Sequence, residues 1–275
     1  MSRLRIEKTL KHYVGGKFIR SESGHTMAIE DSGRVVHVAK GSRKDLRDAV
    51  RIARKAQPGW AARTAYNRGQ ILYRLAEMLD GRLEALPPGS EAAIDRAVHH
   101  AGWADKITAL LSSLNPVAGT YVNYSRIRPM GVLVAAPDAA DGLLGQVEAA
   151  CACAVMGNTA ILVIDAADAI AAAALAEALA TSDFPGGVIN VLCGDQDDLL
   201  RHAAAHDDLD GITLAGDAGS AVRTELETQG ARVMRRLVAL PGAQTPAAPH
   251  HLQRLAEVQT VWMSAYEPRG GAAAY

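Results

Sequence analysis

The hydrophobic pattern of this chain is densest between Gly131 and Leu240, where short apolar runs alternate with helix-length spacers. The runs are rich in Val, Ile and Leu and cover Gly131–Ala136, Thr159–Ile164, Gly187–Leu192, Gly211–Leu214 and Val233–Leu240. The spacers have helical composition and cover Gly142–Met156, Ala167–Thr181, Asp197–His206 and Gly219–Gln229. Apolar runs of this kind are typical of strands buried on both faces. The pattern predicts a doubly wound, Rossmann-like α/β fold with a parallel sheet of about five strands.

The part of the chain before Gly131 predicts a hairpin followed by three helices. Tyr13–Arg20 alternates about a Gly-Gly turn, which is typical of a β-hairpin. Ser42 and Asp45 have capping-box spacing and begin a helix that we expect to end at the Pro58 turn. The second and third helices are predicted at Thr64–Leu83 and Glu91–Leu114. A strand, or one arm of a hairpin, outside the main sheet is predicted at Tyr121–Arg128.

After Leu240 the composition changes to a linker rich in Pro, Ala and Gly. A short helix or turn at Leu252–Ala256 precedes a predicted strand at Glu257–Met263, and the final PRGGAAAY is expected to be a loose tail. The pattern divides the chain into four parts: the amino-terminal hairpin and helices, a strand region outside the sheet, the Rossmann-like sheet, and a linker with a terminal strand, which cover residues 1–120, 121–130, 131–242 and 243–275.

The charge balance and the lack of long apolar segments narrow the class of protein. The chain has 29 basic and 30 acidic side chains and a net charge of −1, so the charge does not favour nucleic acid or a membrane surface as a partner. The segment MSRLRIEKTLKHY has no apolar core of a signal peptide, and no apolar run approaches the ~20 residues that span a bilayer. These patterns favour the cytoplasm.

Parallel sheets of this class bind ligands at the carboxyl ends of their strands, so these positions are the candidates for a nucleotide site. The turn after the first strand, Ala136 to Ala140, has neither G-x-G-x-x-G nor a P-loop. Asp165 follows the second strand and is either an acid that bonds ribose hydroxyls or a solvated loop residue. Gly216 lies in a strand-to-helix turn that suits phosphate, but Asp217 beside it would repel phosphate.

No catalytic or metal-binding constellation is predicted. His202 and His206 have helical metal spacing without a third ligand set, and the adjacent pairs His99-His100 and His250-His251 are expected to diverge at the surface. No G-x-S-x-G elbow is present. The cysteines, which are expected to be packing residues, are Cys151, Cys153 and Cys193.

Several segments together resemble the aldehyde dehydrogenase superfamily. YVGGKFIRSESG from Tyr13 resembles its amino-terminal hairpin, and the segment Arg43–Leu79 resembles its first helical pair. HHAGWADKI from His99 resembles the helix that follows, and RIRPMGVLVAAP from Arg126 resembles the start of the sheet. GNTAILVI, DFPGGVINVL and DGITLAG match the next three strand regions in order, so the resemblance covers nearly all of residues 10–240.

The departures from the family pattern fall at its chemical groups. Asp138-Ala139 stands where the family has the Trp-Asn pair whose Asn helps to hold the oxyanion. Val163 stands at the Lys that contacts the adenosine ribose, Asp217 at the phosphate-binding Ser, and Ala239 at the general-base Glu. No segment resembles the family's catalytic domain, and Cys193 does not align with its nucleophile. The resemblance therefore implies a protein without catalytic residues.

The resemblance also implies that assembly segments are present. HLQRLAEVQTVWM, His251–Met263, is similar to the family's carboxyl-terminal oligomerisation strand, and the region around Tyr121–Arg128 is similar to its companion hairpin. The interface residues that this implies are Tyr121, Tyr124, Val258, Val261 and Trp262.

Three functional hypotheses follow from the resemblance. The first is a catalytically inactive assembly protein that pairs with itself or with a full-length aldehyde dehydrogenase. The second is an NAD- or NADP-binding, or sensory, module, with Asp165, Gly187 and Gly216 as the candidate cofactor contacts. The third is residual NAD-dependent aldehyde oxidation, which needs an activated thiolate and a base.

Overall fold

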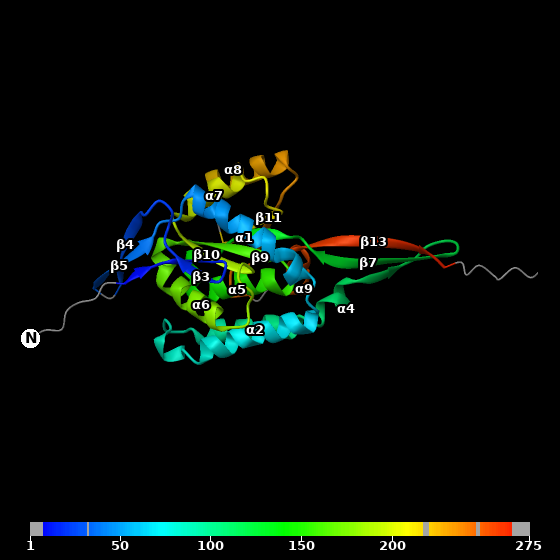
Figure 1. Cartoon of the computed structure of the whole chain (residues 1–275). Helices are drawn as coiled ribbons and strands as arrows, with labels where there is room; N and C mark the ends of the chain where they lie inside the picture. Colours follow the sequence, from blue (N-terminus) through cyan, green and yellow to red (C-terminus); the bar gives the residue numbers. More distant parts are fainter. Residues whose placement is uncertain (1–7, 32, 217–219, 246–247, 266–275) are drawn as a thin grey trace, which may run out of the picture.

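A computed structural model describes residues 8–31, 33–216, 220–245 and 248–265. In this part of the chain the main sheet has the strand order β12-β11-β8-β9-β10-β2-β3 (Figure 1). Its parallel strands are β8 (Val132–Ala136), β9 (Thr159–Asp165), β10 (Ile189–Gly194), β11 (Gly211–Ala215) and β12 (Arg236–Leu240). The predicted doubly wound α/β fold is confirmed. β8 is its topological switch, because the chain proceeds to β9 and β10 on one side and to β11 and β12 on the other.

The amino-terminal hairpin extends this sheet instead of standing apart from it. β2 (His12–Val14) pairs antiparallel with β10 and with β3 (Lys17–Ile19). Asn190, which is fully buried on β10, accepts a hydrogen bond from the N–H of Gly15 (2.9 Å) and so ties the hairpin turn to the sheet.

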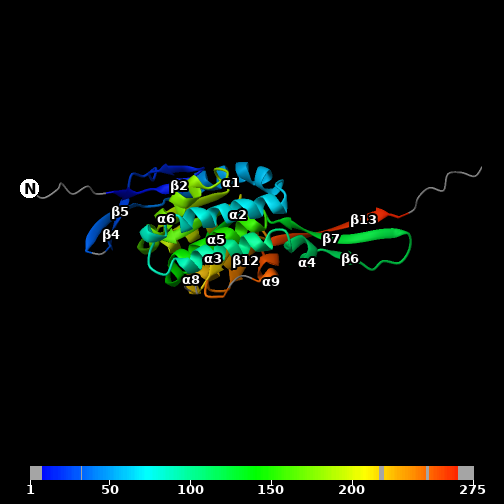
Figure 2. The same cartoon turned by 90° about the horizontal axis from the view of Figure 1, so that it is seen from below.

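Helices cover both faces of the sheet, which is why its strands are apolar throughout. On β8, Val132 and Val134 face one cluster with α1 and α7, while Leu133 and Ala135 face the other cluster with α2, α5 and α6. Figures 1 and 2 show these two helical layers. The helices of the first layer are α1 (Arg43–Ala61), α7 (Gln196–Ala204) and α8 (Ser220–Arg232). Those of the second layer are α2 (Ala65–Asp80), α3 (Glu91–Trp103), α5 (Gly142–Val155) and α6 (Ala169–Thr181).

The capping box at the start of α1 is present as predicted, but the helix does not stop at Pro58. Ser42 Oγ accepts the N–H of Asp45, and the Asp45 carboxylate accepts the N–H of Ser42. The helix continues through Pro58 to Ala61. Pro58 cannot donate to the preceding turn. Trp60 is buried and its Nε1 donates to Ala154 O (3.0 Å), so packing of the last turn offsets the lost hydrogen bond.

The predicted third helix, Glu91–Leu114, is wrong in its second half. α3 ends at Trp103, a turn follows, and α4 (Ile107–Leu111) is a separate short helix. The chain then enters β6 (Ser113–Asn115), where Leu114 pairs with Tyr124 on β7 (Tyr121–Pro129). The pairing with a distant strand outweighs the local helical pattern.

Two small sheets protrude from opposite ends of the body (Figures 1 and 2). One consists of β1 (Thr9–Leu10), β5 (Arg34–Ala39) and β4 (Thr26–Asp31), which the hydrophobic pattern does not predict. The other consists of β6, β7 and β13 (Ala256–Ser264) and is called the arm below. α9 (Pro249–Gln253) precedes β13. The short 3-10 helices are η1 (Leu83–Ala85), η2 (Ala139–Asp141) and η3 (Ala166–Asp168).

Several predicted boundaries shift by a few residues. β10 begins at Ile189 instead of Gly187, and β12 begins at Arg236 instead of Val233 because Met234 has a positive φ of 52° that interrupts the extended chain. The predicted tail PRGGAAAY lies outside the described residues. None of the helices in the described ranges is long and apolar enough to span a bilayer.

Candidate functional site

The arm places the two predicted assembly segments side by side. β13 pairs antiparallel with β7 over its whole length, from Ala256 opposite Pro129 to Ser264 opposite Tyr121. β6 pairs with the other edge of β7. Because side chains alternate across a strand, this register divides the arm into two faces.

One face of the arm is apolar toward the Tyr121 end of β7, whereas nearer the body the same face carries Arg126 and Arg128 opposite Gln259 and Glu257. Leu114, Tyr124 and Val261 form a row across its three strands, and Val122 lies opposite Met263 on the same face. Leu114 is 78% exposed and Met263 is 49% exposed. Leu114 was missed because the signal for β6 is only three residues long and lies inside an apparent helix. Val122 and Met263 lie on predicted strands but were not named as interface residues.

The opposite face of the arm carries a network of polar side chains and, beside it, an aromatic pair. Asn115 Nδ2 donates to Asn123 Oδ1 (2.7 Å) and to Ser125 Oγ (2.8 Å), and the hydroxyls of Ser125 and Thr260 lie 3.0 Å apart. These contacts cross the three strands and specify their register. Tyr121 and Trp262 meet edge to face beside this network, with ring centroids 6.1 Å apart.

The outer edge of β13 presents backbone groups without a neighbouring strand among the described residues. The N–H of Ala265, just beyond β13, donates to Thr120 O (2.8 Å). This bond fixes which residues of β13 direct their backbone N–H and C=O groups toward β7. Alternate residues therefore direct their backbone groups toward β7, and Val258, Thr260 and Trp262 direct theirs outward. The segment from Val258 to Met263 carries no charged side chain that would discourage strand pairing.

The five predicted interface residues are thus all on the arm but not on one face. Val258, Trp262 and Tyr121 lie on the polar-network face, and Val258 and Trp262 are 55% and 62% exposed. Tyr124 and Val261 lie on the apolar face and are directly opposite each other. The free edge of β13 therefore has predicted interface residues on both of its faces.

The carboxyl ends of the main strands form a second candidate site, and it is acidic. Asp138 follows β8, Asp165 ends β9, and Asp168 lies just after it. Burial, together with the charges of Asp165 and Asp138, raises the pKa of Asp168 to about 6. Burial is the largest cause of this shift, and the charges of the neighbouring carboxylates, which add to it, oppose the approach of a phosphate group.

Protein groups already fill much of this crevice. A Cβ on Gly216 would lie 2.0 Å from Asp138 Oδ2, so the Asp138 carboxylate rests against the backbone of Gly216, in the turn considered above as a candidate phosphate site. Gln196 Nε2 donates to Pro137 O (3.1 Å) and Val163 O (2.9 Å) and bridges the ends of β8 and β9. Asp165 Oδ1 accepts the N–H of Ala167 (2.9 Å). These residues do not fit a dinucleotide whose pyrophosphate needs backbone N–H groups and neutral surroundings.

The structure does not bring the three predicted cofactor residues together. Asp165 and Gly216 lie at the carboxyl ends of β9 and β11. Gly187 instead precedes β10 and so lies at the amino ends of the parallel strands. Gly187 has a φ of +94°, and a Cβ at this position would meet Ile52 and Ala56 of α1. Glycine is needed here because the loop before β10 approaches α1 too closely for a side chain.

The cysteines and histidines lack an arrangement for nucleophilic or metal chemistry. Burial raises the pKa of the Cys193 thiol to about 12, and the charges of Asp165 and Asp168 act in the same direction. No cluster of three or more His, Cys, Asp and Glu in the described ranges has the geometry of a metal site. The expectation that the histidine pairs diverge at the surface is wrong in two respects: His100 is fully buried, and the rings of His250 and His251, although exposed and half-buried, lie 3.9 Å apart.

Comparison with known proteins identifies the family of this chain. The profile of the aldehyde dehydrogenase family matches residues 20–248. The chain belongs to the aldehyde dehydrogenase family. It is 26% identical over 273 residues to "Aldehyde dehydrogenase, cytosolic 1" of Elephantulus edwardii, covering 90% of this chain and 52% of that protein. It is 24% identical over 253 residues to an aldehyde dehydrogenase of Davidiella tassiana, covering 85% and 50%.

Solved structures of the family share the fold. PnpE from Pseudomonas sp. WBC-3 superimposes with a TM-score of 0.78 at 22% identity, covering 84% of this chain and 50% of that chain. The NAD-dependent aldehyde dehydrogenase from Sinorhizobium meliloti superimposes with a TM-score of 0.75 at 23% identity, covering 86% and 50%. The chain therefore spans about half the length of the family members it matches.

Two of the positions that depart from the family pattern, Val163 and Ala239, carry apolar side chains. Val163 is fully buried in β9 and packs between the sheet and α1. Ala239 lies on β12, where its carbonyl accepts a hydrogen bond from Arg254 Nη1 (2.8 Å). Asp217 lies outside the described residues. At Val163 and Ala239 the side chains have no group that could bind ribose or accept a proton.

Proposed function

We propose that this member of the aldehyde dehydrogenase family acts in assembly and not in catalysis. Its arm would add a strand edge to edge to a second chain, either another copy of itself or a full-length aldehyde dehydrogenase. The observation that carries the proposal is the uncharged outer edge of β13, from which Val258, Thr260 and Trp262 direct their backbone groups away from β7. Strand addition uses such backbone groups for affinity and flanking side chains for specificity.

The side chains beside this edge supply the apolar contacts that strand addition needs. Trp262 is held by its edge-to-face contact with Tyr121, and an aromatic side chain that is already oriented loses little entropy on binding. On the other face, Tyr124 and Val261 continue the apolar row to Leu114. A partner strand along β13 would therefore cover apolar surface above and below the new ladder.

The absence of suitable groups at the strand ends supports the non-catalytic part of the proposal. The Cys193 thiol is buried and has a raised pKa, and Ala239 cannot act as a base. The carboxylates of Asp138, Asp165 and Asp168 oppose a phosphate-bearing cofactor. We therefore expect the protein to bind no cofactor.

The test is a proline substitution at the open edge of β13. Thr260→Pro removes an N–H that points outward, so the ladder with β7 keeps its hydrogen bonds. Thr260→Ala is the matched control, because it loses the same contact with Ser125 but keeps the N–H. Light scattering and co-purification with a full-length aldehyde dehydrogenase from the same cell report the complex. We expect Thr260→Pro, and not Thr260→Ala, to abolish association. A wild-type chain that stays monomeric with and without the dehydrogenase would contradict the proposal.

A further inference from the structure

A polar cavity of about 580 Å³ lies where the arm joins the body. Its walls come from the end of α1, the start of α2, α4, the base of β7 and the end of α5. The lining residues that carry polar side chains are Gln57, Arg68, Thr108 and Arg128. None of the described residues that line it is Asp or Glu. The cavity is remote from the carboxyl ends of the main strands, since β7 leads into β8 at its amino end.

Arg68 brings a positive charge into this cavity without a carboxylate to balance it. Its Nε donates to Val155 O (3.2 Å) and its Nη1 donates to Arg63 O (2.7 Å), so both contacts are to neutral carbonyl groups. Within the described part of the chain Arg68 has no ion pair, and burial lowers its pKa. A guanidinium that is fixed by two carbonyls still has N–H groups on Nη2 for a third acceptor.

Arg128 brings a second cation to the same cavity from the arm. Glu257 lies directly opposite Arg128 in the ladder, but the Glu257 carboxylate pairs with Arg236. No ion pair of Arg128 is found in the described ranges. Two arginines, one from α2 and one from β7, therefore line one cavity with no acid between them.

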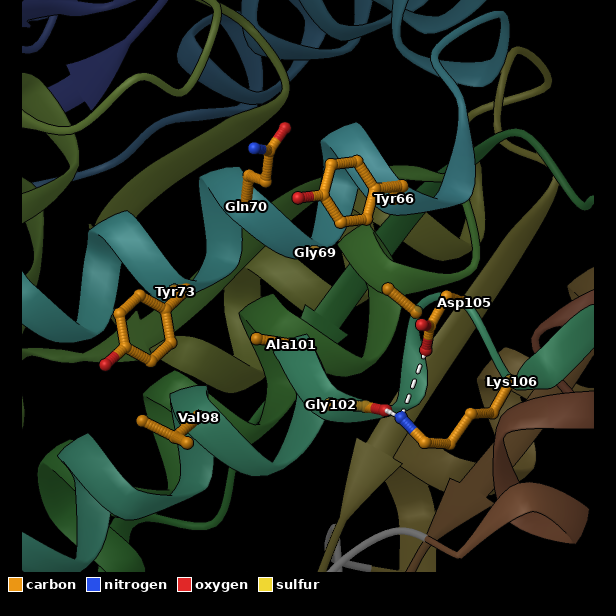
Figure 3. A pocket seen from close by; sticks show the side chains of 10 residues that line it. Tyr66, Gly69, Gln70, Tyr73, Val98, Ala101, Gly102, Asp105 and Lys106 are labelled. Carbon is orange, nitrogen blue, oxygen red and sulfur yellow. Dashed lines mark hydrogen bonds and ion pairs between the residues drawn. The ribbon is translucent and has the colours of Figure 1, made fainter.

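A second cavity of the body lacks this imbalance of charge. The groove between α2 and α3, of about 540 Å³, has Tyr66, Gln70 and Tyr73 on one wall (Figure 3). Its cation, Lys106, is 3.1 Å from the carboxylate of Asp105, so the charge is balanced within the groove. The same protein thus pairs the cation of one cavity and leaves the cations of the other without a carboxylate.

We infer that the cavity at the arm junction binds a small oxyanion, a carboxylate or a phosphate, between Arg68 and Arg128. Arginine presents planar donors that match both groups, and a doubly charged anion matches two arginines. Thr108 and Gln57 add neutral hydrogen-bonding groups, and the volume is that of an ordinary small-molecule site. A bound anion would join α2 of the body to β7 of the arm. The inference is independent of assembly, because every residue it uses belongs to one chain.

Calorimetric titrations with sodium phosphate and with sodium succinate, at an ionic strength held constant with sodium chloride, test this inference. We expect saturable binding of at least one anion to the wild-type protein. Arg128→Gln should weaken it at least tenfold. Arg126→Gln is the matched control, because Arg126 lies on the same face of β7 and bonds Gln259 (2.9 Å) without lining the cavity. This control should bind as the wild type does, and the two anions distinguish a phosphate site from a carboxylate site.

A second variant, Arg68→Lys, keeps the inference testable if Arg128→Gln fails to fold. Lysine retains the charge but not the planar fork, so the dissociation constant should rise several-fold while the melting temperature reports any loss of packing. The inference is overturned if neither anion gives saturable heat with the wild type. It is also overturned if Arg126→Gln and Arg128→Gln weaken binding equally, because that would be a general charge effect.

Discussion

Arg96 Nη1 donates to Glu148 Oε2 at 2.5 Å in the interior of the protein, and His100 Nε2 lies 3.1 Å from the same oxygen. The three residues are buried and join α3 to α5. Burial by itself would raise the pKa of Glu148, but the hydrogen bonds and charges of His100 and Arg96 hold it below its usual range. Glu148 therefore stabilises the fold at neutral pH, and this contribution decreases as the pH falls below the ordinary value for glutamate.

Removal of the Glu148 charge should strongly destabilise the protein. Glu148→Gln leaves Arg96 buried without its counter-ion, which costs about 3–5 kcal/mol. Glu177→Gln is the control, because Glu177 forms an exposed pair with Lys8 that contributes at most about 1 kcal/mol. Urea unfolding of the two variants measures the difference. Equal midpoints would show that the buried pair contributes no more than a surface pair.

The acidic crevice should make stability depend on pH through Asp168. Because its folded pKa of about 6 is raised above its unfolded value, the charged form opposes folding above pH 6, and this penalty disappears as the pH falls toward the unfolded pKa of about 4. Asp168→Asn should therefore stabilise the protein at pH 8 by about 1 kcal/mol, after discounting for partial exposure, and by nearly nothing near pH 4. Asp95→Asn, on an exposed position of α3, is the control for the loss of a carboxylate at the surface. A pH-independent effect of Asp168→Asn would contradict the electrostatic account.

The three cysteines should be unreactive in the folded protein. Cys151, Cys153 and Cys193 are at most 4% exposed, and burial raises the pKa of each thiol. Iodoacetamide at pH 8 should modify none of them in buffer and all three in concentrated urea, as mass spectrometry would show. Rapid modification of Cys193 in buffer would instead support the hypothesis of residual aldehyde oxidation. A hydride-transfer assay on mixed aldehydes, with Cys193→Ser beside the wild type, would then decide it.

The strand-end crevice should not bind NAD or NADP. Asp138 rests against Gly216, Gln196 bridges the ends of β8 and β9, and the neighbouring carboxylates repel phosphate. Calorimetry at millimolar NAD and NADP should give no saturable heat. Saturable heat that is lost in Asp165→Asn would instead support the nucleotide-binding hypothesis.

The hydrophobic pattern by itself was sufficient for the parallel core of the fold. Strands such as β9 are buried on both faces, so their apolar runs cannot be confused with loops, and the spacers are long enough for crossover helices. The capping box of Ser42 and Asp45 was also predictable, because it depends on residues three apart. The strand β13 was predicted as a strand candidate and from its resemblance to the family's carboxyl-terminal segment.

Features that depend on contacts between distant residues were decided only by the tertiary structure. α1 continues through Pro58 because Trp60 packs on Ala154, which lies far along the chain. β6 exists because Leu114 meets Tyr124, and three residues carry too little local signal to outweigh a helical pattern. Strand pairing likewise decides how the arm divides into two faces and that the backbone groups of Thr260 point outward. Packing of the arm on the body forms the cavity lined by Arg68 and Arg128. Local patterns determine elements, whereas register and long-range packing determine which side chains meet.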